Sequence, residues 1–233
     1  MHAIIVLLSG PSCVGKTPLV KSFIQQNPDK KIGKPVLYTS RESRPNETDG
    51  VDYFFRSEQE IKNLDAKRFI VAQTRHMWQA IDVQAHARLV AENDIVLYDV
   101  HPNLIKALQA HAKIKEMQKP MLRVFLQPAT FNEIRDVQHA MGEASLQEAA
   151  AAIMTPKLIA RTQKQGKKLT PEVMRDIQIR AGRAWEEIIV GQDYDHIIIN
   201  HDGEDSDHWR QSPPSGEAGE TLARFAEIVL KYS

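Results

Sequence analysis

The 233-residue chain has one cysteine, no net charge and no long apolar run at its N-terminus, and each of these excludes a class of protein. A single cysteine excludes an intrachain disulfide framework and favours a reducing compartment, so we expect a cytoplasmic protein. Thirty basic and 30 acidic residues cancel, so no global charge favours nucleic acid or an anionic membrane as a partner. The apolar run at residues 3–8 is too short for a signal peptide or a membrane-spanning helix, and no internal repeat is visible.

The N-terminal segment carries the strongest pattern. The apolar run at residues 3–8 predicts a buried strand, and apolar residues recur at helical spacing after residue 18. Between them lies Gly-Pro-Ser-Cys-Val-Gly-Lys-Thr, which fits the phosphate-binding P-loop. Glycines let the backbone approach an anion, and backbone N–H groups at the start of a helix bind phosphate. We therefore predict that a nucleotide's phosphates are bound by Gly10, Pro11, Ser12, Cys13, Val14, Gly15, Lys16 and Thr17.

Three side chains of this loop have individual predicted roles. Lys16 reaches the terminal phosphates, and the Thr17 hydroxyl ligates Mg²⁺. Cys13 lies close in sequence to Lys16 and to the helix start, which predicts a lowered pKa for its thiol. We expect this thiol to be sensitive to oxidation rather than catalytic. The alternative for the whole segment is a glycine-rich turn that binds nothing, and the completeness of the pattern argues against it.

The second informative segment covers residues 39–55. Two arginines three residues apart, Arg41 and Arg44, precede a turn at Gly50 and an aromatic strand that begins near Tyr53. The planar guanidinium suits bidentate phosphate recognition, and a tyrosine hydroxyl adds a neutral donor. The pattern predicts an anion clamp closed by a hairpin. The alternative is a solvated loop whose arginines form weak surface ion pairs.

Together, these segments resemble the guanylate kinase family in motif order and spacing: Gly-Pro-Ser-x-x-Gly-Lys-Thr, then Thr-x-Arg-x-x-Arg-x-x-Glu-x-x-Gly-x-Asp-Tyr-x-Phe. The resemblance implies that Arg41, Arg44 and Tyr53 hold the phosphate of an acceptor such as GMP. It also implies ATP as the donor and Mg²⁺ as the metal.

Alternating strand and helix patterns predict an α/β fold, a parallel sheet flanked by helices with the nucleotide at its carboxyl edge. We expect a P-loop core (residues 1–34, 93–141 and 171–233), a small mixed β subdomain for the acceptor (35–92) and a helical lid insertion (142–170). The expected strands are 36–39, 69–73, 76–81, 94–99, 121–126 and 194–200. The expected helices are a short one that begins at Ser57, with Glu60 completing a capping box, and those at 82–92, 102–115, 130–141, 171–189 and 220–232.

Two strand ends carry further candidates. Asp99 ends a buried strand and resembles the Walker B acid that supports magnesium, and it could also cap the helix that follows at Pro102. Asn200 ends the last strand, which resembles the family segment Tyr-Asp-x-Val-Ile-Val-Asn. That resemblance implies a place near the donor nucleotide's adenine. The nearby His201, Asp205, Asp207 and His208 fit no metal-ligand spacing.

The lid departs from the family pattern. Residues 142–170 combine an alanine-rich helix, Pro156 and a lysine-rich end, which predicts a long, mobile lid. A solvated charge run is an equal alternative to phosphate contact for that end. The helix predicted over 171–189 carries Arg180 and Arg183, and the resemblance implies that Arg180 reaches back to the phosphates and that Arg183 follows it.

The positions that read the acceptor's base also differ. The resemblance places a serine, a glutamate and a second acid of the family at Leu37, at Ile70 (or Gln73 in a shifted register) and at His101. Guanine's N1–H and amino group need acceptors, and aliphatic side chains offer none. The family has a pair of tyrosines in the hairpin of this subdomain, and this chain has Trp78 and Gln79 near that place instead. Trp78 could stack on a planar acceptor, or it could be a core residue.

These features predict an ATP-dependent phosphotransferase that acts on GMP, on another nucleoside monophosphate or on a different phosphorylated metabolite. We expect no nucleic-acid or membrane partner, and the choice between monomer and homodimer stays open. Two alternatives are a binding module without turnover and an NTP-hydrolysing switch. The intact P-loop motif and Asp99 argue against the first, and the lack of a water-positioning signature argues against the second.

Overall fold

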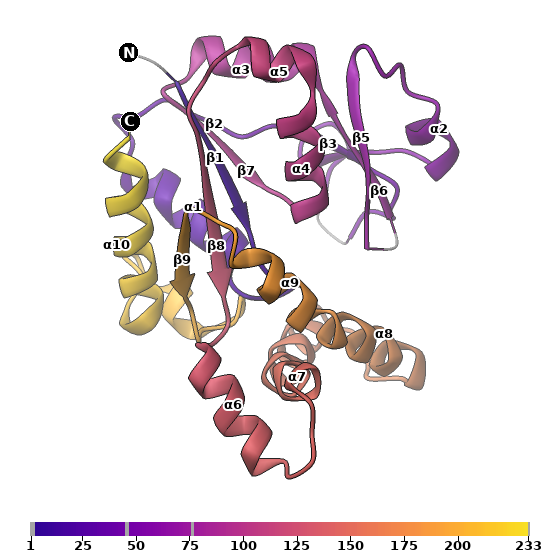
Figure 1. Cartoon of the computed structure of the whole chain (residues 1–233), viewed down its shortest axis with the longest axis vertical. Coiled ribbons are helices and arrows are strands. Elements are labelled where there is room, and N and C mark those ends of the chain that lie inside the picture. Colours follow the sequence, from indigo (N-terminus) through magenta and orange to yellow (C-terminus); the bar gives the residue numbers. More distant parts are fainter. Residues whose placement is uncertain (1–2, 45–46, 76, 233) are drawn as a thin grey trace. The chain divides into compact units, whose positions relative to one another are not determined.

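The computed structural model describes residues 3–44, 47–75 and 77–232 (Figure 1). These residues form two compact units. Unit 1 holds residues 3–7 and 29–122 together with Tyr232, and unit 2 holds residues 8–28 and 123–231. No helix in the described ranges is both long enough and apolar enough to cross a membrane.

The larger sheet has five strands in the order β2-β7-β1-β8-β9. The strands are β1 (Ile4–Ser9), β2 (Ile32–Gly33), β7 (Ile95–Asp99), β8 (Met121–Gln127) and β9 (His196–Ile199). β2 pairs in parallel with β7, and β8 with β9. The central strands are nearly continuous buried apolar runs, as expected for strands covered on both faces. The predicted parallel α/β core is confirmed.

A second, four-stranded sheet lies within unit 1, in the order β4-β3-β6-β5. Its strands are β3 (Leu37–Thr39), β4 (Tyr53–Phe55), β5 (Phe69–Thr74) and β6 (Met77–Asp82). β3 and β4 are parallel, so the predicted hairpin is wrong. The segment between them is long enough to carry the chain back to the start of β3, which a tight hairpin turn cannot do. His76, placed in a predicted strand, lies outside the described residues.

The helices of unit 1 follow their local sequence signals. α2 (Glu58–Lys62) starts at Ser57 with the predicted capping box, which Glu60 completes. The predicted helix 102–115 is two helices, α4 (Pro102–Ala110) and α5 (Ala112–Glu116), because His111 between them has an extended backbone. α3 (Val83–Glu92) matches its predicted range.

The helical spacing of Val83, Ala87 and Val90 predicts that these residues form the buried stripe of α3, and the structure differs. Ala87 is exposed, and His86 is buried with Val83 and Val90. His86 Nδ1 lies 2.6 Å from the hydroxyl of Tyr98, which is fully buried in β7. A histidine is polar, so the sequence pattern places it on the exposed side of the helix. It is buried because Tyr98, in β7, provides the hydrogen-bond partner that a buried imidazole needs.

This pair makes stability depend on pH. Burial lowers the pKa of His86 to about 4, below its ordinary value of 6.5. The neutral imidazole is therefore favoured in the folded state, and its contribution is complete above pH 6.5 and is lost as pH falls toward the folded pKa. We expect this residue alone to lower the free energy of unfolding by about 2 kcal/mol between pH 7.5 and pH 5. In urea titrations, His86→Gln should show a correspondingly smaller loss, and equal losses would contradict this assignment.

In unit 2, α1 (Lys16–Gln26) packs against α10 (Gly216–Leu230) through an edge-to-face contact of Phe23 and Phe225, with ring centroids 5.1 Å apart. α10 begins four residues before its predicted start at 220. The loop before it contains one short 3-10 helix, η1 (Asp207–Arg210).

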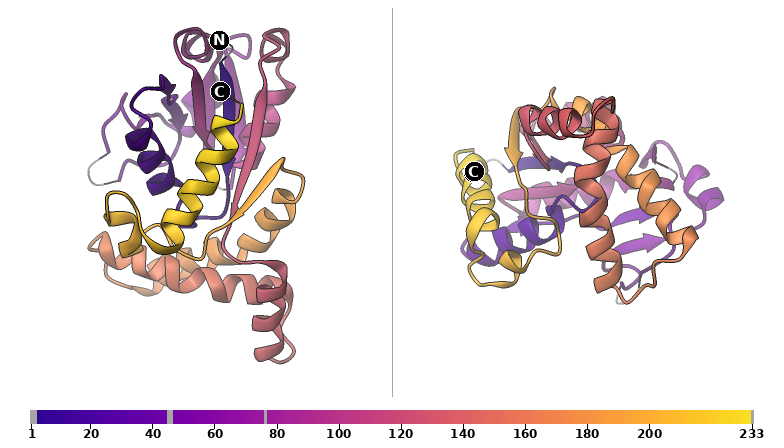
Figure 2. Two further views of the ribbon diagram at one scale, coloured as in Figure 1. Left: turned by 90° about the vertical axis from the view of Figure 1, so that its left-hand side faces the viewer. Right: turned by 90° about the horizontal axis from the view of Figure 1, so that it is seen from below.

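The other helices of unit 2 are α6 (Phe131–Ala140), α7 (Leu146–Lys164), α8 (Pro171–Gly182) and α9 (Ala184–Gly191), and α7 packs against the other three (Figures 1 and 2). α6 has a capping box of Thr130 and Glu133. The spacing of Ile134, Val137 and Met141 predicts one buried face for this helix, but Met141 is 46% exposed. Pro156 does not end α7, which continues through it. The helix predicted over 171–189 divides after Gly182, a residue of weak helix propensity, yet its predicted stripe stays largely buried in α8 and α9.

Candidate functional site

The two P-loop glycines are required by close packing as well as by backbone geometry. A Cβ on Gly10 would lie 2.3 Å from the carbonyl oxygen of Leu126 in β8. Gly15 has a φ of 98°, and a Cβ there would lie 2.6 Å from Nδ2 of Asn200. The loop is therefore pressed onto β8 and Asn200, and this packing sets its path into the first turn of α1.

Lys16 lies across this loop. Its Nζ donates hydrogen bonds to the carbonyl oxygens of Gly10 (2.8 Å) and Pro11 (3.0 Å). Thr17 is exposed in the first turn of α1. An ammonium held over a loop at a helix N-terminus favours an anion at that place.

Asn200 holds the P-loop in place through hydrogen bonds to its backbone. Its side chain is fully buried, and Nδ2 donates to the carbonyl oxygens of Val14 and Asp202, each at 2.7 Å. Its Oδ1 accepts a hydrogen bond from the Thr221 hydroxyl at 3.2 Å. The role in nucleotide binding predicted for Asn200 is thus best explained as positioning the loop.

We expect Asn200→Ala to lower the free energy of unfolding by about 2–4 kcal/mol, because two backbone carbonyls lose their buried donor. ATP affinity should fall with it, since the Val14 carbonyl belongs to the phosphate loop. Urea unfolding and equilibrium ATP binding measure the two effects, with the exposed Gln211→Ala as the control. Unchanged ATP affinity would show that the P-loop binds ATP without the hydrogen bond from Asn200 to the Val14 carbonyl.

The basic residues of α7 bind the loop that follows β9. Arg161 forms an ion pair with Glu204, Lys157 donates to the carbonyl oxygen of His201, and Lys164 donates to that of Asp205. The Glu204 backbone N–H in turn donates to the Cys13 carbonyl oxygen at 3.0 Å. The sequence analysis missed this role, although residues 157, 161 and 164 share one face of a helix.

Of the two arginines predicted to reach the phosphates, Arg180 contacts the P-loop directly. Its Nη2 donates to the Ser12 hydroxyl at 3.1 Å and lies 3.7 Å from the Cys13 sulfur. Its Nη1 lies 3.4 Å from Asp176, one turn earlier on α8. Arg183 stands at the junction of α8 and α9, and its carbonyl accepts from the Glu187 N–H at 3.2 Å. The structure therefore brings Arg180 to the predicted phosphate site, and the role of Arg183 stays a prediction.

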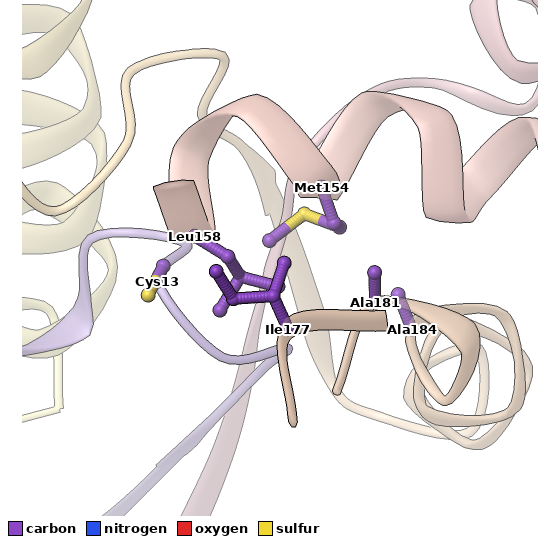
Figure 3. Packing of buried hydrophobic residues seen from close by; sticks show 6 residues of the cluster. All are labelled: Cys13, Met154, Leu158, Ile177, Ala181 and Ala184. Atoms are coloured by element: carbon purple, nitrogen blue, oxygen red, sulfur yellow. The ribbon is translucent and has the colours of Figure 1, made fainter. Parts of the chain in front are cut away.

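Cys13 belongs to a buried apolar cluster that joins the P-loop to α7, α8 and α9 (Figure 3). The side chains drawn are Cys13, Met154, Leu158, Ile177, Ala181 and Ala184. Burial raises the pKa of the thiol and outweighs the nearby guanidinium groups of Arg161 and Arg180. The predicted lowering of this pKa is wrong, because desolvation of the thiolate exceeds the attraction of the charges.

In unit 1, the Glu47 carboxylate forms hydrogen bonds with both arginines of the predicted clamp. Arg41 holds Glu47 through two hydrogen bonds of 2.6 Å, and its guanidinium carbon lies 4.8 Å from the ring centroid of Tyr53 and 5.4 Å from that of Phe55. Glu47 also accepts from the Arg44 backbone N–H at 2.8 Å. Burial alone would raise the pKa of Glu47, but the hydrogen bonds from Arg41 and Arg44 lower it, so the carboxylate is ionised.

The two arginines of the clamp therefore differ. The Arg41 side chain is 15% exposed, and both terminal nitrogens of its guanidinium donate to Glu47. The Arg44 side chain is 41% exposed, with Nη1 3.9 Å from Glu47. Arg44 is thus the guanidinium better placed to meet an anion from solvent. Glu47 was not predicted as functional, although it lies within the clamp motif.

Tyr53 and Asp99 are electrostatically coupled in unit 1. Burial raises the pKa of the Tyr53 hydroxyl, and the Asp99 carboxylate raises it further, so the hydroxyl is a neutral hydrogen-bond donor at neutral pH. Thr17 and Asp99 supply the hydroxyl and carboxylate oxygens that magnesium prefers. No group of three histidine, cysteine, aspartate or glutamate side chains that could hold a metal occurs among the described residues, so magnesium bound by Thr17 or by Asp99 would also need oxygens of the nucleotide's phosphates.

Strand register decides which predicted base-reading residues share the Tyr53 face of the sheet. Leu37 is paired with Tyr53, and Ile70 with Ile81, which puts both aliphatic residues on that face. Gln73 pairs with Trp78 and lies on the opposite face, so the shifted register considered for Gln73 is wrong. His101 caps α4, its Nδ1 accepting from the Asn103 N–H at 3.2 Å.

Trp78 therefore does not face the predicted acceptor site. Its indole N–H donates to Glu58 at 3.1 Å, and the Lys62 ammonium lies 4.8 Å from the ring centroid. Both partners belong to α2, which covers this side of the sheet. The stacking role proposed from the sequence is wrong, and the residue is a half-buried anchor for α2 rather than a core tryptophan.

Comparisons with known proteins agree on one family. The guanylate kinase family model matches residues 2–156. The chain is 29% identical over 203 residues to a guanylate kinase of Maricaulis maris, covering 86% of this chain and 77% of that one. It is 25% identical over 234 residues to a guanylate kinase of Mycoplasmoides gallisepticum, covering 100% and 94%. The fold resembles the crystal structure of guanylate kinase from Anaplasma phagocytophilum, with a TM-score of 0.58 and 17% identity over 99% of this chain and 86% of that one.

Proposed function

The chain belongs to the guanylate kinase family, and from that premise we propose that it transfers the γ-phosphoryl group of ATP to the phosphate of a nucleoside monophosphate such as GMP. The observation that supports the proposal is the presence, in one chain, of two groups of cationic and hydrogen-bond-donor side chains that suit phosphates. One is the P-loop with Lys16 and Arg180, and the other is the clamp of Arg41, Arg44 and Tyr53.

In the proposed reaction, the P-loop holds the donor. The backbone N–H groups from Ser12 to Thr17 and the Lys16 ammonium bind the β- and γ-phosphates. Asn200 keeps the loop in place through the Val14 carbonyl. Thr17 and Asp99 are the residues that would hold magnesium, and the ion would supply positive charge to the phosphates.

The clamp holds the acceptor. Arg44 and the Tyr53 hydroxyl donate hydrogen bonds to the acceptor's phosphate, while Arg41 contributes positive charge and keeps Glu47 and the loop in position. Because a phosphate oxygen is already a nucleophile at neutral pH, no dedicated base is needed. An oxygen of the acceptor phosphate attacks the γ-phosphorus, the bond to the β–γ bridging oxygen breaks, and ADP leaves.

The guanidinium of Arg180 fits the charge of the transferring group. It is already within hydrogen-bond distance of the P-loop residue Ser12. A cation at this place stabilises the charge that spreads over the γ-phosphate oxygens in the transition state. We propose that Arg183 assists it once the acceptor is bound.

The test is ADP release in the presence of GMP and of other phosphorylated acceptors. The proposal predicts ADP release that requires both an acceptor and magnesium. Release without any acceptor would identify an NTP-hydrolysing switch instead. ATP binding without ADP release, for every acceptor tried, would identify a binding module.

A further inference from the structure

The acceptor-binding sheet of unit 1 has a row of side chains that leads away from the clamp. Phe55 of β4 is paired with Thr39 of β3, Thr39 with Gln79 of β6, and Gln79 with Ala72 of β5. Paired residues point to the same face, so these four share the face of Tyr53. The Arg41 guanidinium lies over Phe55 at one end of the row, and Gln79 stands two strands further along.

Gln79 is the polar group of this row that can form hydrogen bonds with a ligand. Thr39 is fully buried, and the Phe55 and Ala72 side chains are apolar. The buried Thr74 hydroxyl donates to Gln79 Oε1 at 3.1 Å, and it thereby fixes the orientation of the amide. In the part of the chain that the structure describes, Nε2 of Gln79 has no hydrogen-bond acceptor, and the side chain is half-buried. The row therefore offers an oriented N–H donor.

The distance from the clamp to the Gln79 amide is similar to the distance from the phosphate of a nucleotide to its base. Neighbouring strands are about 4.8 Å apart, so two strands separate Phe55 from Gln79 by about 10 Å. That is roughly the reach from a phosphate across a sugar to the far edge of its base. A monophosphate clamped by Arg44 and Tyr53 would thus bring its base to Gln79.

We propose that Gln79 determines the acceptor's base, and that its amide N–H selects a base with an oxo group, as in guanine or hypoxanthine, over one with an amino group, as in adenine. This inference rests on the proposed function. An amino group would meet the Nε2 donor with another donor, and both would lose a partner. The neighbouring Leu37, Ile70 and Ala72 carry no side-chain acceptor for guanine's N1–H or 2-amino group, so that amino group adds little to binding.

The experiment compares kcat/KM for GMP, IMP and AMP in the wild type, Gln79→Leu and Gln79→Glu, with thermal unfolding as the check on folding. The wild type should prefer IMP to AMP by about 100-fold or more, and should use GMP and IMP within about threefold of each other. Gln79→Leu should reduce the ratio of IMP to AMP at least about tenfold. Gln79→Glu, whose carboxylate only accepts, should shift the preference toward AMP. The matched control, Gln73→Leu, changes the same residue type on the opposite face and should leave all ratios unchanged.

Equilibrium binding of IMP and AMP, measured by calorimetry on the same variants, separates this inference from the proposed function. Selective IMP binding that is lost in Gln79→Leu, with no turnover, would support the role of Gln79 and contradict the transferase. Turnover whose base preference is unchanged in Gln79→Leu, or a wild type that prefers AMP, would overturn the role of Gln79 and leave the transferase standing. Absence of any nucleoside monophosphate binding would overturn both.

Discussion

Lys16→Ala is expected to lower the rate of phosphoryl transfer by about 1,000-fold or more. The ammonium of Lys16 lies across the loop on the carbonyls of Gly10 and Pro11, where the terminal phosphates of ATP would bind. No other side chain of the loop motif carries a positive charge. Because only two partly exposed hydrogen bonds are lost, the free energy of unfolding should fall by no more than about 2 kcal/mol. Steady-state kinetics and urea unfolding on the same preparation measure the two quantities.

Lys21→Ala is the control for this variant. Lys21 is an exposed lysine on the same helix, α1, and lies outside the loop motif. It should retain wild-type activity within about threefold, as expected for a solvated charge. Substantial activity in Lys16→Ala, or equal losses in the two variants, would contradict the assignment of the P-loop as the donor site.

Arg44→Ala is expected to lower kcat/KM for the acceptor by about 100-fold or more while changing the affinity for ATP by less than about twofold. Arg44 is the more exposed guanidinium of the clamp, with 41% of its side chain accessible, so it is the arginine that an acceptor's phosphate can reach from solvent. Arg41→Ala would be a less specific test, because it would leave the Glu47 carboxylate without its bidentate partner. Initial rates at varied acceptor, and separate ATP titrations, resolve the effect.

Arg88→Ala serves as the matched control, since Arg88 is an exposed arginine on α3 of the same unit. It should leave the acceptor's KM unchanged. If Arg44→Ala weakened ATP binding and left the acceptor's KM unchanged, the clamp would belong to the donor instead. Equal effects of Arg44→Ala and Arg88→Ala would show that only the general positive charge matters.

The sequence identified the elements whose signals are local. The P-loop, the helix starts at Ser57 and Thr130 and the buried strands depend on residues adjacent in the chain, and all are present. Arg41 of the clamp also lies over the ring of Tyr53, its partner in the motif. Such features follow from spacing, because hydrogen bonds within a turn or a cap need no distant partner.

The errors concern features that depend on distant partners. The parallel pairing of β3 and β4, and the side of the sheet on which Trp78 lies, follow from register, which no single strand encodes. The pKa of Cys13 is raised because helices more than a hundred residues away bury it. The burial of His86 depends on Tyr98 in another element. The sequence places Pro156 after an alanine-rich helix, but α7 continues through this proline because it packs on α6, α8 and α9.

The most direct test of the central claim is the fate of a radiolabelled γ-phosphate of ATP, followed in the presence of magnesium and unlabelled GMP or IMP. Direct transfer between two anion-binding sites predicts that the label appears in the β-phosphate of the corresponding nucleoside diphosphate, in amounts equal to the ADP formed. Label released as inorganic phosphate, or label that stays in ATP with every acceptor, would contradict it.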